Sequence, residues 1–238
     1  MFETKIEPRW YTAAITRCSV RRYTGAPDGA ALNKLGAFTR QISYQGVRVV
    51  LLQGPGLPGR IHGTDIYAAI VGGKSAPRAL EGYVGEALAL EAAAMGLGTC
   101  WLGSFSKNVV RLAAKVSKDE RLSCIMAIGA CAPQSPHHKR RPLTQTCGLD
   151  EDARCALPAW QQAALECAAI APSACNLQPW RLQAEPGSLA VNDGGNLLGL
   201  GEIGRGIAML HVAAGALSSN VRGVWREGDK GWIFRANV

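Results

Sequence analysis

PRWYTAAI at residues 8–15 is repeated as PAWQQAAL at residues 158–165, so that the proline, the tryptophan and two alanines recur 150 positions later. Apolar residues in both copies fall at helical spacing, and proline suits a first helical turn because its missing N–H is no loss there. The repeat predicts two related helices, and with them a chain made of two similar halves.

A second repeat supports the same division of the chain. Two apolar stripes share the offsets 0, +4, +7, +11 and +14, which place each stripe on one side of a helix. The stripes consist of Tyr83, Ala87, Leu90, Ala94 and Leu97 in the first half, and of Ile203, Ile207, Leu210, Ala214 and Leu217 in the second. Any two amphipathic helices can share such offsets, so coincidence stays open for this repeat taken alone.

Runs rich in β-branched and other apolar residues predict strands in both halves. These runs cover residues 47–52, 66–71 and 122–130, then 188–191 and 231–238. A polar, proline-bearing stretch at 133–157 separates the two groups. We expect a first half at 1–142, a linker at 143–157 and a shorter second half at 158–238. Together they would form one compact domain, with the long helices central and any cofactor at the seam.

The composition excludes several classes of protein. Hydrophobic residues make up 47% of the 238 residues and charged residues 18%, and no apolar run could cross a bilayer, so disordered and membrane-embedded chains are excluded. The net charge of +8 favours anionic partners such as phosphates, nucleic acid or a membrane surface. The eight cysteines show no C-x-x-C motif or zinc-finger spacing, and no signal peptide is visible. We therefore expect a cytoplasmic protein with reduced thiols and no metal.

Gly54, Gly56 and Gly59 match the G-x-G-x-x-G pattern of dinucleotide-binding turns. Pro55 and Pro58 stand between them and remove backbone N–H donors that would face a pyrophosphate, and no helix signal follows. We interpret this stretch as a loop.

Two basic motifs are candidates for an anion site. Arg17, Ser19 and Arg21 form R-x-S-x-R after the first helix, and two guanidinium groups that flank a hydroxyl can bind a phosphate dianion. A solvated basic helix end is the alternative. The run HHKRR at residues 137–141 is the densest positive stretch, and it fits an exposed loop, a nucleic-acid contact or a second part of the same phosphate site.

The segment APSACNLQPW at residues 171–180 is more specific. Two prolines stiffen it and leave Ser173, Asn176 and Gln178 as polar groups that can contact the edge of a planar heterocycle. Asx turns between the prolines are the alternative.

The segment GLGTCWLG at residues 96–103 is predicted to end the long helix of the first half. Gly98 would act as the stop of that helix, and Gly103 would allow backbone N–H groups to approach a ligand. Cys100 has no histidine nearby in the sequence, so we interpret it as a buried structural thiol rather than a nucleophile.

Together these motifs resemble the FMN-dependent nitroreductase family, and more closely its single-chain branch, in which two halves imitate the usual homodimer. The resemblance covers nearly the whole chain, and its motifs are RCSVRRY at 17–23, VRVVLL at 47–52, GYVGEALALE at 82–91, GLGTCWLG at 96–103 and APSACNLQPW at 171–180. It implies an α+β fold with three α/β/α layers, an antiparallel-rich sheet, and a flavin at the seam of the internal pseudo-dimer.

The resemblance also implies which residues bind the cofactor. They are Arg17, Ser19, Arg21, Trp101, Leu102, Gly103, Lys139, Arg141, Pro172, Ser173, Asn176 and Gln178. The R-x-S-x-R motif and the basic run would hold the FMN phosphate, and the serine and asparagine of the second half would contact the flavin ring. Backbone N–H groups of Leu102 and Gly103 would face the reactive ring nitrogen. No catalytic side chain is implied, and since each half carries different motifs, we expect one flavin per chain.

The implied activity is hydride transfer from NAD(P)H through FMN to a nitroaromatic or quinone-like acceptor. A flavin-binding protein without turnover and a flavin-fragmenting relative are the alternatives, and the net charge alone would also allow a nucleic-acid-binding protein. We expect a small-molecule acceptor as partner, no nucleic acid, no membrane, and a monomer, because the second half takes the place of a partner subunit.

Overall fold

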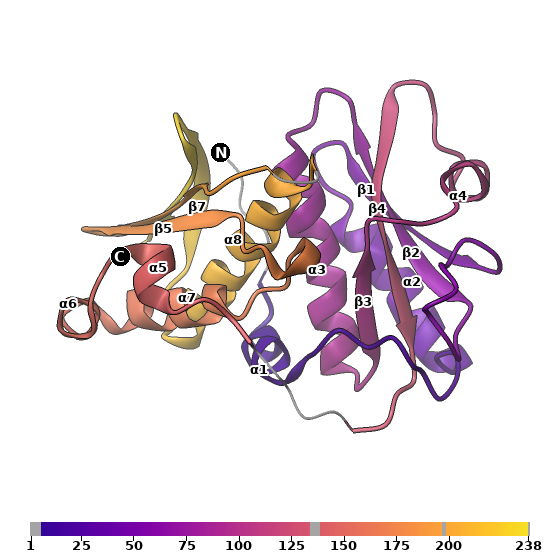
Figure 1. Ribbon diagram of the computed structural model, residues 1–238, viewed down its shortest axis with the longest axis horizontal. Helices are drawn as coiled ribbons and strands as arrows, with labels where there is room; N and C mark the ends of the chain where they lie inside the picture. Colours follow the sequence, from indigo (N-terminus) through magenta and orange to yellow (C-terminus); the bar gives the residue numbers. More distant parts are fainter. Residues whose placement is uncertain (1–5, 134–138, 197–198, 238) are drawn as a thin grey trace. The chain divides into compact units, whose positions relative to one another are not determined.

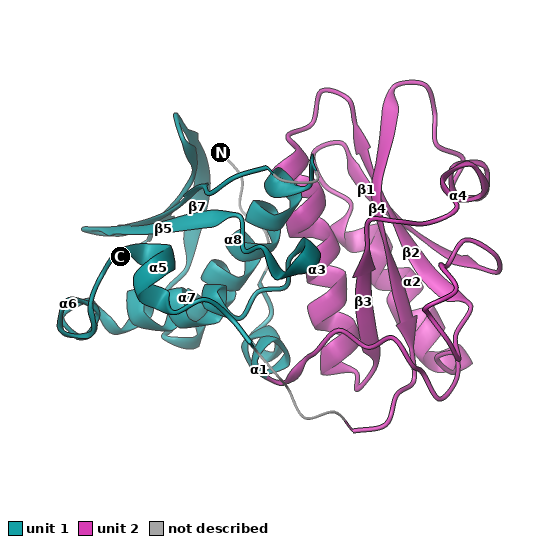
Figure 2. Cartoon of the chain, in the orientation of Figure 1, with its two compact units in different colours: residues 1–15, 138–238 teal, residues 16–137 magenta. Residues whose placement is uncertain are grey.

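The structure is a computed structural model that describes residues 6–133, 139–196 and 199–237, and it divides into two compact units (Figure 2). Unit 1 comprises residues 1–15 and 138–238, and unit 2 comprises residues 16–137. The units therefore differ from the expected halves in that the N-terminal residues join the C-terminal part of the chain.

The segment expected to be a linker, residues 143–157, holds two short helices of unit 1. These are α5 (Leu143–Cys147) and α6 (Glu151–Cys155). Asp150 caps α6, because its side chain accepts a hydrogen bond from the backbone N–H of Ala153 at 2.8 Å. Helix α5 packs against the strand β5 (Trp180–Glu185) and the helix α7 (Ala159–Ala169). The segment therefore belongs to a packed unit.

Unit 2 is built on an antiparallel sheet with the strand order β1-β2-β4-β3 (Figure 1). Its strands are β1 (Val47–Gln53), β2 (Ile66–Gly73), β3 (Gly98–Leu102) and β4 (Glu120–Gly129). The interior strand β2 is buried along nearly its whole length, which explains its uninterrupted apolar sequence.

Helices and loops cover both faces of this sheet. On one face lie α2 (Gly29–Ile42), capped by Asp28, and α3 (Arg78–Ala94), which connects β2 to β3. On the other face, Val110 of α4 (Lys107–Ala113) joins a core formed by the strands, the segment that precedes α2 and the loop that precedes β2. Unit 2 thus has helix on both sides of a sheet.

The end of α3 differs from the prediction made for Gly98. The helix ends at Ala94, and Gly96 takes the left-handed conformation with φ of 78°. Backbone N–H groups of Gly96 and Leu97 then bond to carbonyl groups of the last helical turn. The predicted stop at Gly98 was wrong: this glycine opens β3, where a Cβ atom would lie 2.9 Å from Val20.

Unit 1 contains a second antiparallel sheet with the strand order β5-β6-β8-β7. Its strands are β5 (Trp180–Glu185), β6 (Ser188–Asp193), β7 (Gly223–Gly228) and β8 (Gly231–Ala236). One long helix, α8 (Gly201–Ser218), packs on this sheet, and α7 (Ala159–Ala169) packs on α8. The N-terminal helix α1 (Arg9–Thr16) lies near α7, because Tyr11 interacts with Glu166 there.

The two units repeat one topology, as the sequence repeats predicted. In unit 2, α3 joins β2 to β3, and β4 lies between these two strands in the sheet. In unit 1, α8 joins β6 to β7, and β8 lies between these two strands. The helices expected after Pro8 and Pro158 are α1 and α7, and all five expected strands are present within the described residues. The second copy is shorter in three places. Residues 170–179 hold only a short 3-10 helix, η1 (Ala174–Asn176), where the first copy has α2, and the connections from β5 to β6 and from β7 to β8 are tight turns.

The glycine-rich stretch after β1 is a loop, in agreement with the sequence interpretation. Gly56 has φ of 142°, and a Cβ atom there would lie 2.7 Å from the hydroxyl of Tyr67. That hydroxyl donates a hydrogen bond to the carbonyl oxygen of Pro55 at 2.7 Å. The loop is therefore held against β2. The Tyr67 side chain occupies the space beside Gly56 that a pyrophosphate would need.

No helix of the described part of the chain is long and apolar enough to span a membrane. The same residues contain no group of three or more side chains that could hold a metal ion.

Candidate functional site

One candidate set of residues lies in unit 2, where the R-x-S-x-R segment runs beside β3. Ser19 forms a parallel bridge with Thr99, and the backbone N–H of Val20 donates to the carbonyl oxygen of Thr99 at 3.0 Å. This pairing places Arg17 next to the start of β3. Arg17 is only 6% exposed, although it carries a charge. Its Nη2 lies 3.5 Å from the hydroxyl of Ser19, at the limit of a hydrogen bond.

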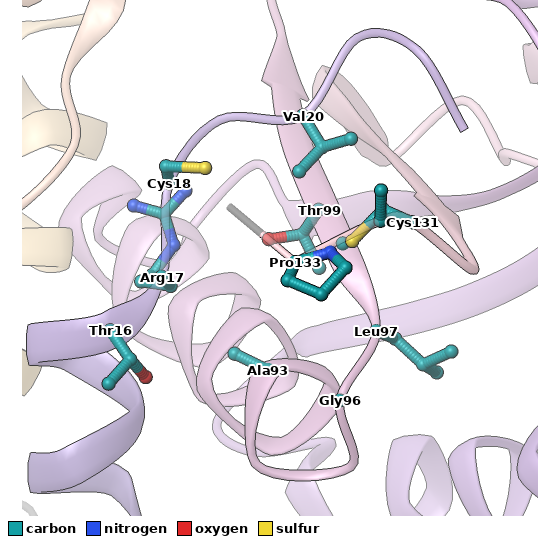
Figure 3. A pocket seen from close by; sticks show the side chains of 12 residues that line it. Thr16, Arg17, Cys18, Val20, Ala93, Gly96, Leu97, Thr99, Cys131 and Pro133 are labelled. Carbon is teal, nitrogen blue, oxygen red and sulfur yellow. The ribbon is translucent and has the colours of Figure 1, made fainter. Parts of the chain in front are cut away.

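Arg17 opens onto a pocket of about 230 Å³ within unit 2 (Figure 3). The pocket is lined by Thr16, Arg17, Cys18, Val20, Ala93, Gly96, Leu97, Gly98, Thr99, Cys131, Ala132 and Pro133. Figure 3 shows the hydroxyl of Thr99 directed to the side on which Arg17 lies. The walls are thus small or apolar apart from a guanidinium and a few hydroxyl and thiol groups.

Two buried polar groups in this pocket have no partner among the described residues: Nε of Arg17 and Oγ1 of Thr99. Thr99 is 1% exposed, so solvent water does not readily supply the hydrogen bond that its hydroxyl lacks. A buried donor without a partner costs about 1–3 kcal/mol. A ligand with several acceptor oxygens would satisfy both groups, and an anion would also pair with the buried charge of Arg17.

Further positive charge lies near β3. Burial raises the pKa of the Cys100 thiol, and the charges of Arg21, Arg17 and Arg60 act in the opposite direction. Arg60 comes from the glycine-rich loop, whose backbone pairs with the N-terminal segment where the N–H of His62 donates to the carbonyl of Arg21 at 3.0 Å. Unit 2 carries 14 Lys and Arg residues against 7 Asp and Glu residues, a net charge of +7. It therefore holds nearly all of the chain's net charge of +8. The field of unit 2 therefore favours an anion.

The other end of β3 holds the remaining unit 2 residues of the implied set. Leu102 is buried in the core on one face of the sheet. Trp101 points to the opposite face, where its Nε1 donates to Oε2 of Glu86 at 2.7 Å. Gly103 is exposed and follows the last registered pair of the strand, Leu102 with Ile125. From Thr99 to Gly103 the strand advances about 13 Å.

A second candidate set of residues lies in unit 1, where residues 139–141 are joined to the proline-flanked segment. Nη1 of Arg140 donates to Oδ1 of Asn176 at 2.8 Å, and Nδ2 of Asn176 donates to the carbonyl oxygen of Lys139 at 2.7 Å. Nη2 of Arg140 also donates to the carbonyl oxygen of Ile170 at 3.1 Å. Arg140 thus connects the basic run to both ends of the neighbouring loop.

Gln178 is part of the framework of this loop. It is 2% exposed, its Oε1 accepts from the backbone N–H of Arg141 at 2.9 Å, and its Nε2 donates to the carbonyl of Asn176 at 3.0 Å. Its own backbone N–H donates to the hydroxyl of Ser173 at 2.9 Å. Pro172 is buried beside it. The hydroxyl hydrogen of Ser173 and the exposed side chain of Asn176 are the groups that remain accessible.

The same loop has an unusual backbone. Cys175, Asn176 and Gln178 have φ of 49°, 57° and 47°, in the left-handed region that residues with a Cβ atom rarely adopt. Each such residue stores about 1 kcal/mol or more, and the Gln178 bonds hold the loop in this form. A strained loop that is held by the Gln178 bonds suits a surface that must keep one shape for a ligand.

The structure therefore brings the implied residues together in two sets, one per unit. Arg17, Ser19 and Arg21 lie beside β3, which ends in Trp101, Leu102 and Gly103; in unit 1, Lys139 and Arg141 adjoin the loop of Pro172, Ser173, Asn176 and Gln178. His137 and His138 lie outside the described residues. Sequence reasoning gave Arg140 only as a member of the basic run and assigned no role to Thr99 or Arg60, because only the pairing of distant segments shows their neighbours.

Comparisons with known proteins agree on a family. A family model described as "Putative TM nitroreductase" matches residues 10–216. A crystal structure from Thermotoga maritima, described as "a putative nitroreductase", aligns over 100% of this chain and 98% of its own, with 19% identity and a TM-score of 0.74. This likeness confirms the predicted α+β nitroreductase fold across both units. No curated protein matches the chain.

Other solved structures align with part of the chain. A nitroreductase family protein from Clostridium difficile covers 60% of this chain and 97% of its own, with 19% identity and a TM-score of 0.48. An FMN-dependent nitroreductase from the same species covers 53% and 91%, with 14% identity and a TM-score of 0.44. The family match spans most of this chain, from α1 to α8. The protein therefore belongs to the nitroreductase family.

Proposed function

We propose that the protein is an FMN-dependent oxidoreductase that takes hydride from NAD(P)H and reduces a nitroaromatic or quinone-like acceptor. The observation that carries the proposal is the pocket of unit 2, where the buried guanidinium of Arg17 and the buried hydroxyl of Thr99 both have donors without partners among the described residues. A phosphate monoester offers three strong acceptor oxygens and two negative charges, which match these groups.

In this proposal Arg17, Ser19 and Thr99 would hold the phosphate of FMN, with Arg21 and Arg60 adding longer-range attraction. Residues along β3 and Gly103 would hold the rest of the cofactor. The strand length of about 13 Å between Thr99 and Gly103 is one that an extended mononucleotide can cover. Gly103 is exposed and has no side chain, so backbone N–H groups there can approach the flavin ring closely.

We infer that unit 1 supplies the remaining contacts. The exposed cations Lys139 and Arg141 would complete the phosphate clamp, while Ser173 and Asn176 would contact the ring. The rigid loop around Gln178 supports this role, since a preformed surface binds without a further ordering cost. Pro172 and Gln178 would then act by shaping the loop and not by touching the flavin.

The residues of this chain bind and orient, and the electron transfer belongs to the cofactor. When bound, FMN accepts hydride from NAD(P)H and passes electrons to the acceptor. Backbone N–H groups at Leu102 and Gly103 would stabilise the negative charge of the reduced ring. We propose that one chain binds one flavin and works as a monomer, because the two units carry different parts of the implied residue set.

Anaerobic spectroscopy tests the proposal. Protein loaded with FMN should show a bound flavin spectrum that bleaches on addition of NADH or NADPH and returns when menadione or nitrofurazone is added. Protein that binds FMN but does not bleach would instead be a flavin carrier. Protein that stays colourless after addition of FMN would overturn the proposal.

A further inference from the structure

The side chain of Trp101 is fixed to α3 from two sides. Along β3, Cys100 and Leu102 point into the core on one face of the sheet. Trp101 lies between them and points to the other face, toward α3. The two contacts of Trp101 with the helix come from consecutive residues, Gly85 and Glu86.

Glu86 holds the polar edge of the indole. Its side chain is 0% exposed, and its Oε2 accepts the N–H of Trp101 at 2.7 Å. Hydrogen bonds to a carboxylate are stronger than those between neutral groups, and a buried carboxylate is costly unless such bonds satisfy it. Glu86 also takes part in further interactions.

Gly85 makes room for the other edge of the indole. A Cβ atom at this position would overlap Cη2 of Trp101 and lie 2.9 Å from its Cζ2. It would also lie 3.1 Å from Cγ1 of Ile70 on β2. The six-membered ring of the indole therefore occupies the space that any larger residue at position 85 would need.

We propose that Glu86 is a positioning residue, which holds Trp101 in one orientation and thereby fixes the backbone of Leu102 and Gly103 at the end of β3. The proposal rests on the proposed function, in which that backbone faces the flavin ring. No motif in the sequence indicated a role for Glu86.

The end of β3 needs such a support for a structural reason. The ladder with β4 stops at Leu102, so Gly103 has no strand partner among the described residues to orient it. Gly103 is a glycine with wide conformational freedom, and disorder there would weaken any contact through its N–H. The Leu102 side chain in the core and the Trp101 side chain on α3 hold the last two residues before it from opposite faces. Loss of either anchor would loosen the backbone at the ring.

A purely structural role for Glu86 is the rival explanation, and a double-mutant cycle separates the two. We would compare Glu86→Ala in the wild type with Glu86→Ala in Trp101→Phe, which lacks the N–H but keeps an aromatic ring. If Glu86 acts through Trp101, Glu86→Ala should weaken FMN binding about tenfold in the first background and less than about twofold in the second. Glu86→Gln keeps an acceptor and should bind FMN within about threefold of the wild type.

The midpoint potential of bound FMN is the readout that a merely structural role would not move. Backbone N–H groups near the ring stabilise the reduced form more than the oxidised form. Glu86→Ala should therefore make the potential more negative, and Glu86→Gln should restore it. An equal loss of FMN affinity in both backgrounds, or an unchanged potential in Glu86→Ala, would overturn the proposal.

A flavin-free measurement tests the packing itself. Gly85→Ala should lower the urea midpoint of the apoprotein when residue 101 is tryptophan, and should lower it much less in Trp101→Phe, which lacks the overlapping atoms. Gly36→Ala in α2 is the matched control, because a Cβ atom there meets nothing within 4 Å. Equal effects of Gly85→Ala in both backgrounds would contradict the packing argument. Wild-type protein that binds no FMN would instead overturn the proposed function, and with it the positioning role of Glu86.

Discussion

Arg140 and Asn176 form a hydrogen bond of 2.8 Å, from Nη1 to Oδ1, and the side-chain N–H of Asn176 donates in turn to the backbone of Lys139. These two bonds join the segment after the undescribed residues 134–138 to the loop that follows α7. Since Asn176 itself has a left-handed backbone, the bonds hold a conformation that the chain alone would not favour.

The first prediction concerns this junction. Arg140→Ala removes bonds to Asn176 and to the carbonyl of Ile170, and we expect a loss of about 1–2 kcal/mol in unfolding free energy. Hydrogen exchange should quicken at residues 173–178 and not in β5 or β6. Arg226→Ala, an exposed arginine on β7, is the control, with an expected change within about 0.5 kcal/mol. A loss in Arg140→Ala no greater than in the control would contradict this account.

Thr99→Val should have opposite effects on the apoprotein and on FMN binding. The change keeps the volume of the side chain and removes a buried hydroxyl without a partner among the described residues, so the apoprotein should gain up to about 1 kcal/mol of stability. FMN binding should weaken about tenfold, because a phosphate would lose a donor. Thermal unfolding and fluorescence titration check the two effects. A destabilised apoprotein would show that the hydroxyl has a structural partner.

The ion pair of Arg48 and Glu120 should make stability depend on acid pH. Arg48, with added hydrogen bonding from Ser117, lowers the pKa of Glu120 from the usual value of 4.5 to about 2. The lowered pKa adds stability that is present above pH 4.5 and is lost as the pH falls toward 2. Glu120→Gln should therefore cost about 1 kcal/mol at pH 7, and the cost should shrink below pH 4.5. A difference from wild type that stays constant from pH 7 to pH 2.5 would refute this.

Thiol reactivity should follow burial. Burial is the main cause that raises the pKa of Cys100, and it raises the pKa of Cys124 to about 12, so both thiols are protonated at neutral pH. Cys155 and Cys175 are exposed. Mass spectrometry after a short treatment with iodoacetamide at pH 7.5 should find label on the exposed pair first. Early label on Cys100 would contradict its interpretation as a structural thiol.

Much of the fold could be read from apolar periodicity. The repeats at Trp10 and Trp160 indicated two similar units, and the structure shows the same strand order in each. The strand β3 was missed because residues 98–102 include a glycine and lack an alternating pattern of apolar and polar side chains. Its partners, β4 and the segment at Ser19, lie far away in the sequence, and strands depend on such partners.

The candidate site could be predicted only in part. Sequence motifs indicated Arg17 as a phosphate-binding residue and Asn176 as a contact of a planar ring, because their residue types and spacing suit these groups. Thr99 and Glu86 carry no such signal, since a threonine on a strand and a glutamate on a helix are usually exposed. Their importance follows from burial, which depends on packing between segments far apart in the sequence.

The measurement that tests the central claim most directly is a comparison of FMN with riboflavin, which lacks the phosphate. Fluorescence titration of the wild type should give one FMN per chain, with FMN bound at least about 100-fold more tightly than riboflavin. Arg17→Ala should lose most of that preference while its affinity for riboflavin stays the same. Equal affinities for the two flavins in the wild type would contradict the account.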